Sequence, residues 1–393
     1  MKFFVKHFLF CFVLFYSQAQ TTFYLAPVKD SDTWKWSYMT PEGEIKFTLN
    51  SDIIYAKEFS GNMAPIQNKK EFWGFVDPKG SIKIVPKYPK VEAFDEVSGI
   101  ALVHDIEKGP IYINQDGNQP FEIEAIKIYE FRKGGAFIRT EQGLQIINSK
   151  GEVVANSMFF DSIKRDHEGN FIVKKDRKSG IYSPSGKQIV PLEYDFVGSF
   201  AYGYAPSRKN EEWGFVDSNN TFHQIPNAVK LWDFRNGFAR FRSNDRGHIG
   251  YFNTSLEPQI NAIYSEGKHF GEGHVGVEHK NKWGFINENG NPVGPQDLEF
   301  ALAFYDGYGI FMGNDRVGIL DSKGKVVMEP DLYVFTGSFS GFAGTVEMIV
   351  EGTVRLRLKK GKGLFGFINI ETGQVVNKWF DRVGKFREVS IPE

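Results

Sequence analysis

Short stretches of alternating apolar and polar residues recur along this chain, and each is followed by a turn sequence. In the stretch 283–290, Trp283 and Phe285 fall on one face of an extended strand and Ile286 falls on the other, because successive side chains of a strand alternate. The stretch ends in Asn-Glu-Asn-Gly, where asparagine accepts a local backbone bond and Gly290 takes a positive φ. This pattern predicts short antiparallel strands joined by tight turns.

The strand-and-turn pattern recurs about ten times in phase, so self-similarity is the strongest signal in the sequence. The positions equivalent to Trp283 are Trp36, Trp73, Pro110, Leu144, Ser179, Trp213, Ile249, Val317 and Phe365. Consecutive positions lie 34 to 37 residues apart, except for the last interval of 48 residues. Glycine follows most of these positions, as at Gly74, Gly214, Gly284, Gly318 and Gly366. The longer last interval predicts an inserted hairpin near 345–362.

Two further elements recur in the same phase. An apolar residue and proline follow the turn, as in Val85-Pro86, and proline suits the end or edge of a sheet because it cannot donate to a ladder. Later come an aromatic residue, a glycine and a small residue, as in Phe234, Gly237 and Ala239, where a neighbouring unit can approach closely. Each repeat is therefore predicted to be a meander of three or four short antiparallel strands.

These phased Trp-Gly segments resemble the WG-containing repeat family, which is related to the KWG repeats. The resemblance extends from about Trp34 to Phe386 and rests on the turn and the glycine-and-small-residue element as much as on the dipeptide. It implies a bacterial origin, an all-β repeat fold and a role in interactions. It implies no catalytic residue.

A repeat of this length cannot bury its own sheet, so consecutive repeats are expected to stack and to share one continuous core. The predicted fold class is an all-β tandem array, either an open superhelical solenoid or a propeller-like ring. Propellers usually have four to eight blades, so about ten repeats favour an open array or an incomplete propeller. Residues 20–393 are expected to form one repeat domain, because no linker divides them.

The first 19 residues are typical of a secretory signal peptide. Lys2 and Lys6 precede an apolar run over 8–16, and Ser17 and Ala19 supply small residues for cleavage. The run is shorter than the ~20 residues that span a bilayer, and no later stretch is long enough. We therefore expect an exported protein, periplasmic or extracellular, with no integral membrane segment after cleavage.

Composition narrows the possible partners. The formal net charge is −1, so no basic excess exists to neutralise phosphates, and nucleic acid is excluded as an expected partner. The single cysteine, Cys11, lies in the signal segment, so the mature chain is expected to have no disulfide and no thiolate nucleophile. Aromatic residues make up 16% of the chain, which fits strands and raises the question of sugar stacking.

The motifs of common enzyme classes are absent from the sequence, which has no nucleophile elbow, phosphate loop or His-Glu-x-x-His helix. The segment 114–118 comes nearest to a calcium loop but has one carboxylate. His269, His274 and His279 share a repeat, yet His274 and His279 have opposite strand parity. We expect no catalytic, cofactor-binding or metal-binding residue, and we interpret the Trp-Gly positions as structural.

Three functions remain open at this point. The favoured one is a non-enzymatic scaffold of the cell envelope or exterior that binds an unknown protein partner. The alternative is a carbohydrate-binding or glycan-active protein of propeller type, which would require exposed Trp or Tyr clustered in a groove with facing carboxylates. The third is a structural protein with no specific ligand, which would require uniform repeats.

Overall fold

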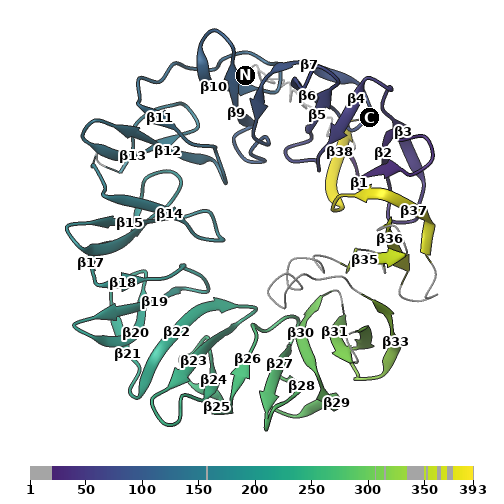
Figure 1. Ribbon diagram of the computed structural model, residues 1–393. Helices are drawn as coiled ribbons and strands as arrows, with labels where there is room; N and C mark the ends of the chain where they lie inside the picture. Colours follow the sequence, from purple (N-terminus) through teal and green to yellow (C-terminus); the bar gives the residue numbers. More distant parts are fainter. Residues whose placement is uncertain are drawn as a thin grey trace, which may run out of the picture.

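The computed structural model describes residues 20–392, apart from 156–157, 306, 314–315, 334–348, 351–352, 361–363 and 370–374. Within these residues all regular secondary structure is β-strand. The strands form ten small antiparallel units arranged in a ring (Figure 1). This confirms the all-β repeat class. The predicted signal peptide, 1–19, lies outside the described residues.

We number the units along the chain by their third strand, which carries the Trp-equivalent position. The third strands are β2 (Trp36–Met39), β6 (Trp73–Val76), β10 (Gly109–Asn114), β13 (Gly143–Asn148), β16 (Lys178–Tyr182), β20 (Glu212–Asp217), β24 (Ile249–Asn253), β28 (Lys282–Asn287), β32 (Arg316–Asp321) and β36 (Leu364–Asn369). The second strands are β1 (Gln20–Asp30), β5 (Ala64–Asn68), β9 (Ile100–Asp105), β12 (Gly135–Thr140), β15 (Phe171–Lys175), β19 (Tyr204–Lys209), β23 (Phe238–Ser243), β27 (His274–His279), β31 (Tyr308–Gly313) and β35 (Thr353–Lys360).

The first strand of each unit lies toward the ring centre and the fourth lies at the periphery (Figure 1). The first strands are β38 (Arg387–Pro392), β4 (Ile53–Ala56), β8 (Lys90–Val91), β11 (Lys127–Ile128), β14 (Ser162–Arg165), β18 (Phe196–Val197), β22 (Ala228–Arg235), β26 (Glu266–Gly267), β30 (Phe300–Tyr305) and β34 (Ile349–Val350). The fourth strands are β3 (Ile45–Thr48), β7 (Ile82–Tyr88), β17 (Gln188–Tyr194), β21 (Phe222–Gln224), β25 (Pro258–Tyr264), β29 (Pro292–Leu298), β33 (Val326–Tyr333) and β37 (Val375–Val383). Units 3 and 4 have no fourth strand among the described residues.

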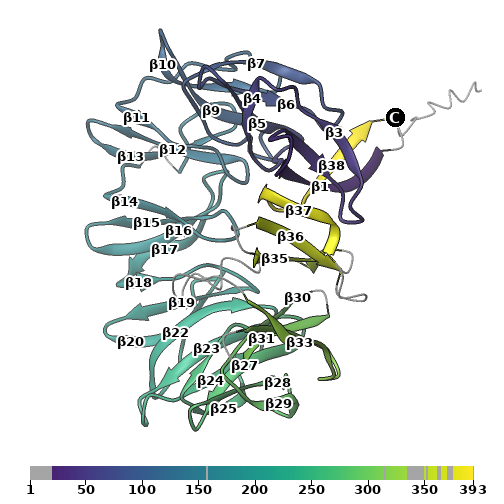
Figure 2. The same ribbon diagram turned by 45° about the vertical axis from the view of Figure 1, so that its right-hand side comes forward.

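Pairing between the two ends of the chain closes the ring. The C-terminal strand β38 pairs with β1 from Gln20↔Pro392 to Leu25↔Arg387, so it supplies the first strand of unit 1 (Figure 2). The far end of β1 also pairs with β37 of unit 10. Of the two predicted shapes, the open solenoid and the propeller-like ring, the structure has the propeller-like ring. The preference for an open array rested on the usual number of blades, and pairing of the chain ends overrides that argument.

The core of every unit is built on the residue two places after the Trp-equivalent position. Each of these residues is at most 1% exposed: Tyr38, Phe75, Tyr112, Ile146, Ile181, Phe215, Tyr251, Phe285, Ile319 and Phe367. In seven cases the ring contacts a phenylalanine of the next unit, with centroids 4.6 to 5.2 Å apart. These pairs are Tyr38–Phe59, Phe75–Phe94, Tyr112–Phe131, Phe215–Phe234, Tyr251–Phe270, Phe285–Phe304 and Phe367–Phe386.

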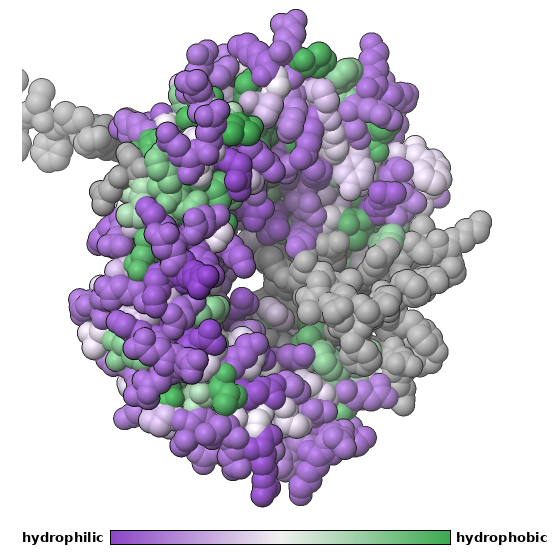
Figure 3. Space-filling model, turned by 60° about the vertical axis from the view of Figure 1, so that its left-hand side comes forward, coloured by the Kyte–Doolittle hydropathy of each residue, from purple (hydrophilic) through white to green (hydrophobic). Residues whose placement is uncertain are grey.

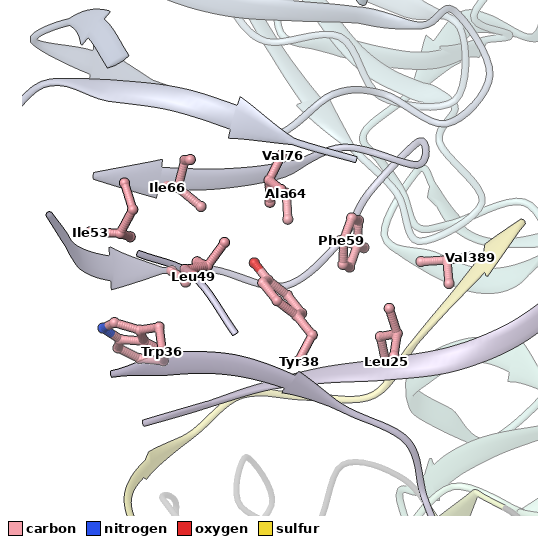
Figure 4. Packing of buried hydrophobic residues seen from close by; sticks show 11 residues of the cluster. Leu25, Trp36, Tyr38, Leu49, Ile53, Phe59, Ala64, Ile66, Val76 and Val389 are labelled. Carbon is pink, nitrogen blue, oxygen red and sulfur yellow. The ribbon is translucent and has the colours of Figure 1, made fainter. Parts of the chain in front are cut away.

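We call these seven contacts the aromatic clasps, because each joins two consecutive units. The first is visible where Tyr38 meets Phe59, close to Val389 of the C-terminal strand (Figure 4). Phe386 directly precedes β38, so the clasp with Phe367 joins unit 10 to unit 1. The packing that links neighbouring units is therefore repeated at the closure.

The glycine after the Trp-equivalent position admits the backbone of the fourth strand. A Cβ on Gly74 would lie 2.3 Å from the Ile84 carbonyl oxygen and 2.6 Å from the Pro86 nitrogen. The register between β6 and β7 shifts there, from Trp73↔Tyr88 to Phe75↔Ile84, so Pro86 lies in a bulge of an edge strand. Proline is tolerated at such a bulge because it needs no ladder partner.

The predicted inserted hairpin near 345–362 is described only in part. Strand β34 pairs with β35, and β35 also pairs with β36, the third strand of unit 10. Residues 345–348, 351–352 and 361–362 of the predicted hairpin lie outside the described residues.

Candidate functional site

The Trp-Gly positions lie in the packing between strands. Trp36 and Trp283 are buried, and Trp73 and Trp213 are half-buried. The Trp36 indole donates a 2.9 Å bond from Nε1 to the Ile54 carbonyl. The glycines face close neighbours: a Cβ would lie 2.5 Å from an atom of His223 at Gly214, 2.3 Å from one of Gln296 at Gly284 and 2.3 Å from one of Phe311 at Gly318. In unit 10, Phe365 is half-buried and Gly366 is buried.

Lysine side chains cover two of these indole rings. Lys57 Nζ lies 4.5 Å from the ring centroid of Trp73, and Lys268 Nζ lies 4.9 Å from that of Trp283. Such cation–π contacts occupy the ring face that a sugar would need for stacking. The four repeat tryptophans therefore do not form the exposed aromatic groove that the carbohydrate hypothesis requires.

The candidate calcium loop is a hydrogen-bonded turn. The Asn114 Oδ1 atom accepts backbone N–H bonds from Asp116 at 3.1 Å and Asn118 at 2.9 Å. Asp77 makes the same two bonds in unit 2, to Lys79 and Ser81. The first side-chain oxygen of each turn is thus already engaged by the backbone, which is how Asx residues stabilise tight turns.

The three histidines singled out from the sequence have separate surroundings. Burial, with Arg240 nearby, lowers the pKa of His269 to about 3. His274 stacks on Phe304 with centroids 4.1 Å apart, and His279 meets Tyr264 edge-on at 6.1 Å. Among the described residues no group of three His, Cys, Asp or Glu side chains is placed to hold a metal ion.

The turns between the first and second strands of units 2 to 8 form a rim around the ring centre (Figure 1). We define this rim by the turns 60–63, 95–99, 132–134, 166–169, 201–203, 235–237 and 271–273. Consecutive rim turns hydrogen-bond to each other, as where Asp95 Oδ2 accepts the Gly134 N–H at 2.9 Å and Ser60 Oγ donates to the Phe94 carbonyl at 2.6 Å.

The same kind of bond recurs farther round the rim. Asn236 Nδ2 donates to the Phe270 carbonyl at 2.6 Å, and Glu272 Oε2 accepts the Gly307 N–H at 2.6 Å. At the closure, Asn62 Oδ1 accepts the Ser390 N–H at 2.9 Å. These bonds join rim turns to the neighbouring units and so restrain the backbone of the rim.

A charged hollow of about 440 Å³ opens on the rim and is shared by units 2 to 5. Its ionisable lining consists of Glu92, Asp95, Glu96, Glu130, Asp166, Arg132, Lys133, Arg165 and His167. Four consecutive units therefore contribute to one concave surface that carries both signs of charge. Glu96 and Lys133 are exposed on it.

Arg165 ties the wall of the charged hollow together. It lies 19 residues after Ile146, the spacing that places Phe131 after Tyr112, so a cation replaces the clasp phenylalanine in unit 5. Its guanidinium donates to the carbonyls of Glu130 at 2.7 Å and Gly135 at 2.9 Å. Burial lowers the pKa of Arg165 to about 10, so the group stays protonated at neutral pH and holds unit 4 against unit 5.

Sequence reasoning did not single out the rim or Arg165. The recurring aromatic-and-glycine element marked these turns, but the sequence did not show that they gather at the ring centre. The departure of Arg165 from the aromatic pattern was the available signal. A charged side chain at the position that buried phenylalanine holds in the seven aromatic clasps indicates a local change of role.

The family model for the WG containing repeat matches residues 73–103, 180–213 and 283–315. The chain thus contains WG containing repeats, and the resemblance that the phased Trp-Gly segments indicated is confirmed at three repeat positions. A comparison with curated proteins finds no match.

The chain also matches solved structures, including one from Citrobacter koseri and one from Moraxella catarrhalis. Apo AztD from Citrobacter koseri is 11% identical over 94% of this chain and 99% of its own, with a TM-score of 0.35. BamB from Moraxella catarrhalis is 11% identical over 77% of this chain and 89% of its own, with a TM-score of 0.29. In the part of the chain that is described, no helix is long and apolar enough to cross a membrane.

Proposed function

We propose that this protein is an exported, non-enzymatic scaffold, periplasmic or extracellular, that binds a protein partner through the charged hollow. The observation that carries the proposal is the sharing of one hollow by four consecutive units whose turns are bonded to each other. A partner seated there would contact several repeats at once without first ordering loops, which lowers the entropic cost of binding.

The chemistry of the hollow favours a polypeptide surface with charges of both signs. Glu96 and Lys133 are exposed and lie on neighbouring rim turns, so each offers a charge to a complementary group. Mixed charges give specificity and orientation more than raw affinity. With the left-hand side of Figure 1 brought forward, the surface is mostly hydrophilic, with apolar residues in separate patches (Figure 3).

The test is affinity capture with the mature chain, residues 20–393, from an envelope extract of its native host. The rim variant Glu96→Lys/Lys133→Glu keeps the net charge but reverses both exposed charges of the hollow. The matched control Lys70→Glu/Glu141→Lys makes the same changes at exposed residues in turns between second and third strands.

We expect one partner that the wild type and the control retain and the rim variant loses at least tenfold. Equal retention by all three proteins would remove the hollow from the proposal. Recovery of glycan with no protein would favour the carbohydrate function instead.

A further inference from the structure

Unit 3 leaves the outer edge of its third strand open. Its sheet has the order β10-β9-β8, so β10 has a neighbour on one side. In eight of the other nine units a fourth strand lies in this position, and in unit 4 the bridges Ile147↔Val153 and Leu144↔Phe160 cover it. Within the described residues, β10 is therefore the one third strand without pairing on its outer side.

The direction of the open groups follows from the turn after β10. The Asn114 N–H donates to the Asn118 carbonyl at 2.8 Å, so the polar groups of Asn114 point away from β9. Because successive residues of a strand alternate, the N–H and C=O of Tyr112 and the C=O of Pro110 point the same way. In the described structure none of these three groups makes a hydrogen bond.

Residues 119–125, which occupy the place of a fourth strand in the sequence of unit 3, lie beside β10 without pairing to it. In residues 119–125 the apolar side chains of Phe121, Ile123 and Ala125 pack against the core between units 3 and 4, while Glu122 and Glu124 are exposed. The segment alternates as a strand would, yet it belongs to no sheet. It packs through its side chains and leaves the backbone edge of β10 unused.

A groove of about 410 Å³ lies between β10 and the segment 119–125. Its walls include Pro110 and Ile111 of β10 and Phe121 and Ile123 of the opposite segment, with Lys108 at its border. Gln119 and Glu122 also line the groove, so its side chains are both apolar and polar. On one side β10 offers one backbone donor and two acceptors that pair with no other strand. A chain that supplies alternating backbone donors and acceptors together with apolar side chains matches both features, and an extended peptide has this chemistry.

We propose that the groove beside β10 binds an extended segment of a partner polypeptide, which adds to unit 3 as its fourth strand. Tyr112 donates one backbone bond to this segment, and the carbonyls of Tyr112 and Pro110 accept two. The side chains of the segment alternate between the face of Ile111, toward unit 2, and the face of Ile123, toward unit 4. Pro110 has no N–H, so the edge is short, which restricts indiscriminate pairing. The inference shares with the proposed function the idea that the ligand is a polypeptide, but it uses a different surface.

The probe is a displayed library of random twelve-residue peptides, selected on the mature chain. Enriched peptides are synthesised in two forms, N-methylated at all odd or at all even residues. In strand addition, alternate residues face the edge, so one form should bind at least tenfold more weakly while the other stays within threefold of the parent peptide. Equal effects of the two forms, or no enrichment over an unrelated protein, would overturn the proposal.

The variant Pro110→Val tests whether the peptides bind at the edge of β10. It adds an N–H that points along the open edge, and one further net hydrogen bond should tighten binding about fivefold. The matched control Pro258→Val changes an exposed proline on β25, whose unit already has four strands, and should leave the affinity unchanged. The assignment to β10 is wrong if Pro110→Val binds the peptides as the wild type does.

Two further outcomes separate the alternatives. If the mature chain dimerises, Pro110→Val strengthens the dimer and no peptide binds, the edge belongs to a second copy and the proposal is overturned. The rim variant Glu96→Lys/Lys133→Glu should bind the selected peptides as the wild type does. Peptide binding that persists while rim capture fails therefore counts against the proposed function alone.

Discussion

Phe386→Ala tests whether the ring is closed in solution. The Phe386 side chain is 3% exposed, and its ring centroid lies 4.6 Å from that of Phe367. Removing a buried phenylalanine side chain costs about 3–5 kcal/mol, of which about 0.5–1.5 kcal/mol belongs to the aromatic pair itself. If β38 is docked on β1, Phe386→Ala should lower the free energy of unfolding by this full amount.

The assay is urea unfolding of the mature chain followed by tryptophan fluorescence, with midpoints compared at an unchanged m-value. Phe94→Ala removes the equivalent ring from a clasp inside the chain, whose centroids lie 4.7 Å apart, and serves as the internal reference. Ile106→Ala alters a turn residue that is 68% exposed and should change stability by less than about 0.5 kcal/mol.

Closure is refuted if Phe386→Ala costs under about 1 kcal/mol while Phe94→Ala costs the expected amount. That result would mean that the last strand frays before the ring unfolds, because a fraying end contributes little to global stability.

Three further predictions concern single sites, and each is measured as the free energy of unfolding. Tyr251→Phe removes the 2.8 Å bond from the hydroxyl to the Lys268 carbonyl and should cost about 1–3 kcal/mol, because it leaves a part-buried acceptor unpaired; no loss would mean that water replaces the bond. Gly74→Ala should cost more than about 1 kcal/mol, because its Cβ would lie 2.3 Å from the Ile84 carbonyl oxygen; a neutral result would show that β7 can move. Burial lowers the pKa of His269 to about 3, so only the unfolded chain binds this proton as the pH falls from about 6.5. Stability should therefore decrease between these values, and His269→Gln should flatten that part of the profile; an unchanged slope would place the acid sensitivity elsewhere.

The local features of a repeat could be predicted from the sequence because they depend on neighbours along the chain. Asn287 and Gly290 mark a turn wherever they occur, and the turn bonds of Asn287 are present, with Oδ1 accepting from Asn289 and Asn291 at 3.0 Å each. The close approach at Gly74 could likewise be predicted, since glycine at a fixed strand position indicates that another backbone comes near.

The contacts between units could not be predicted with the same ease, because a constant spacing along the chain does not show which side chains meet in space. Tryptophan is the most distinctive residue of the repeat, yet the residue two places after it is more deeply buried than the tryptophan itself. Phe75 is fully buried while Trp73 is half-buried. The open edge of β10 could not be predicted either, because residues 119–125 have the apolar and polar alternation of a fourth strand and still do not pair with β10.

Ring closure, in contrast, has a signal in the sequence, which is the spacing of the last two clasp residues. Phe386 follows Phe367 by 19 residues, the spacing of the internal clasps Phe75–Phe94 and Tyr251–Phe270. The last described strand, β38, thus has the position of a first strand after the clasp. Its partner in the ladder is β1, the second strand of unit 1. This pairing completes a four-stranded unit and covers one edge of each strand, whose backbone N–H and C=O groups would otherwise stay open.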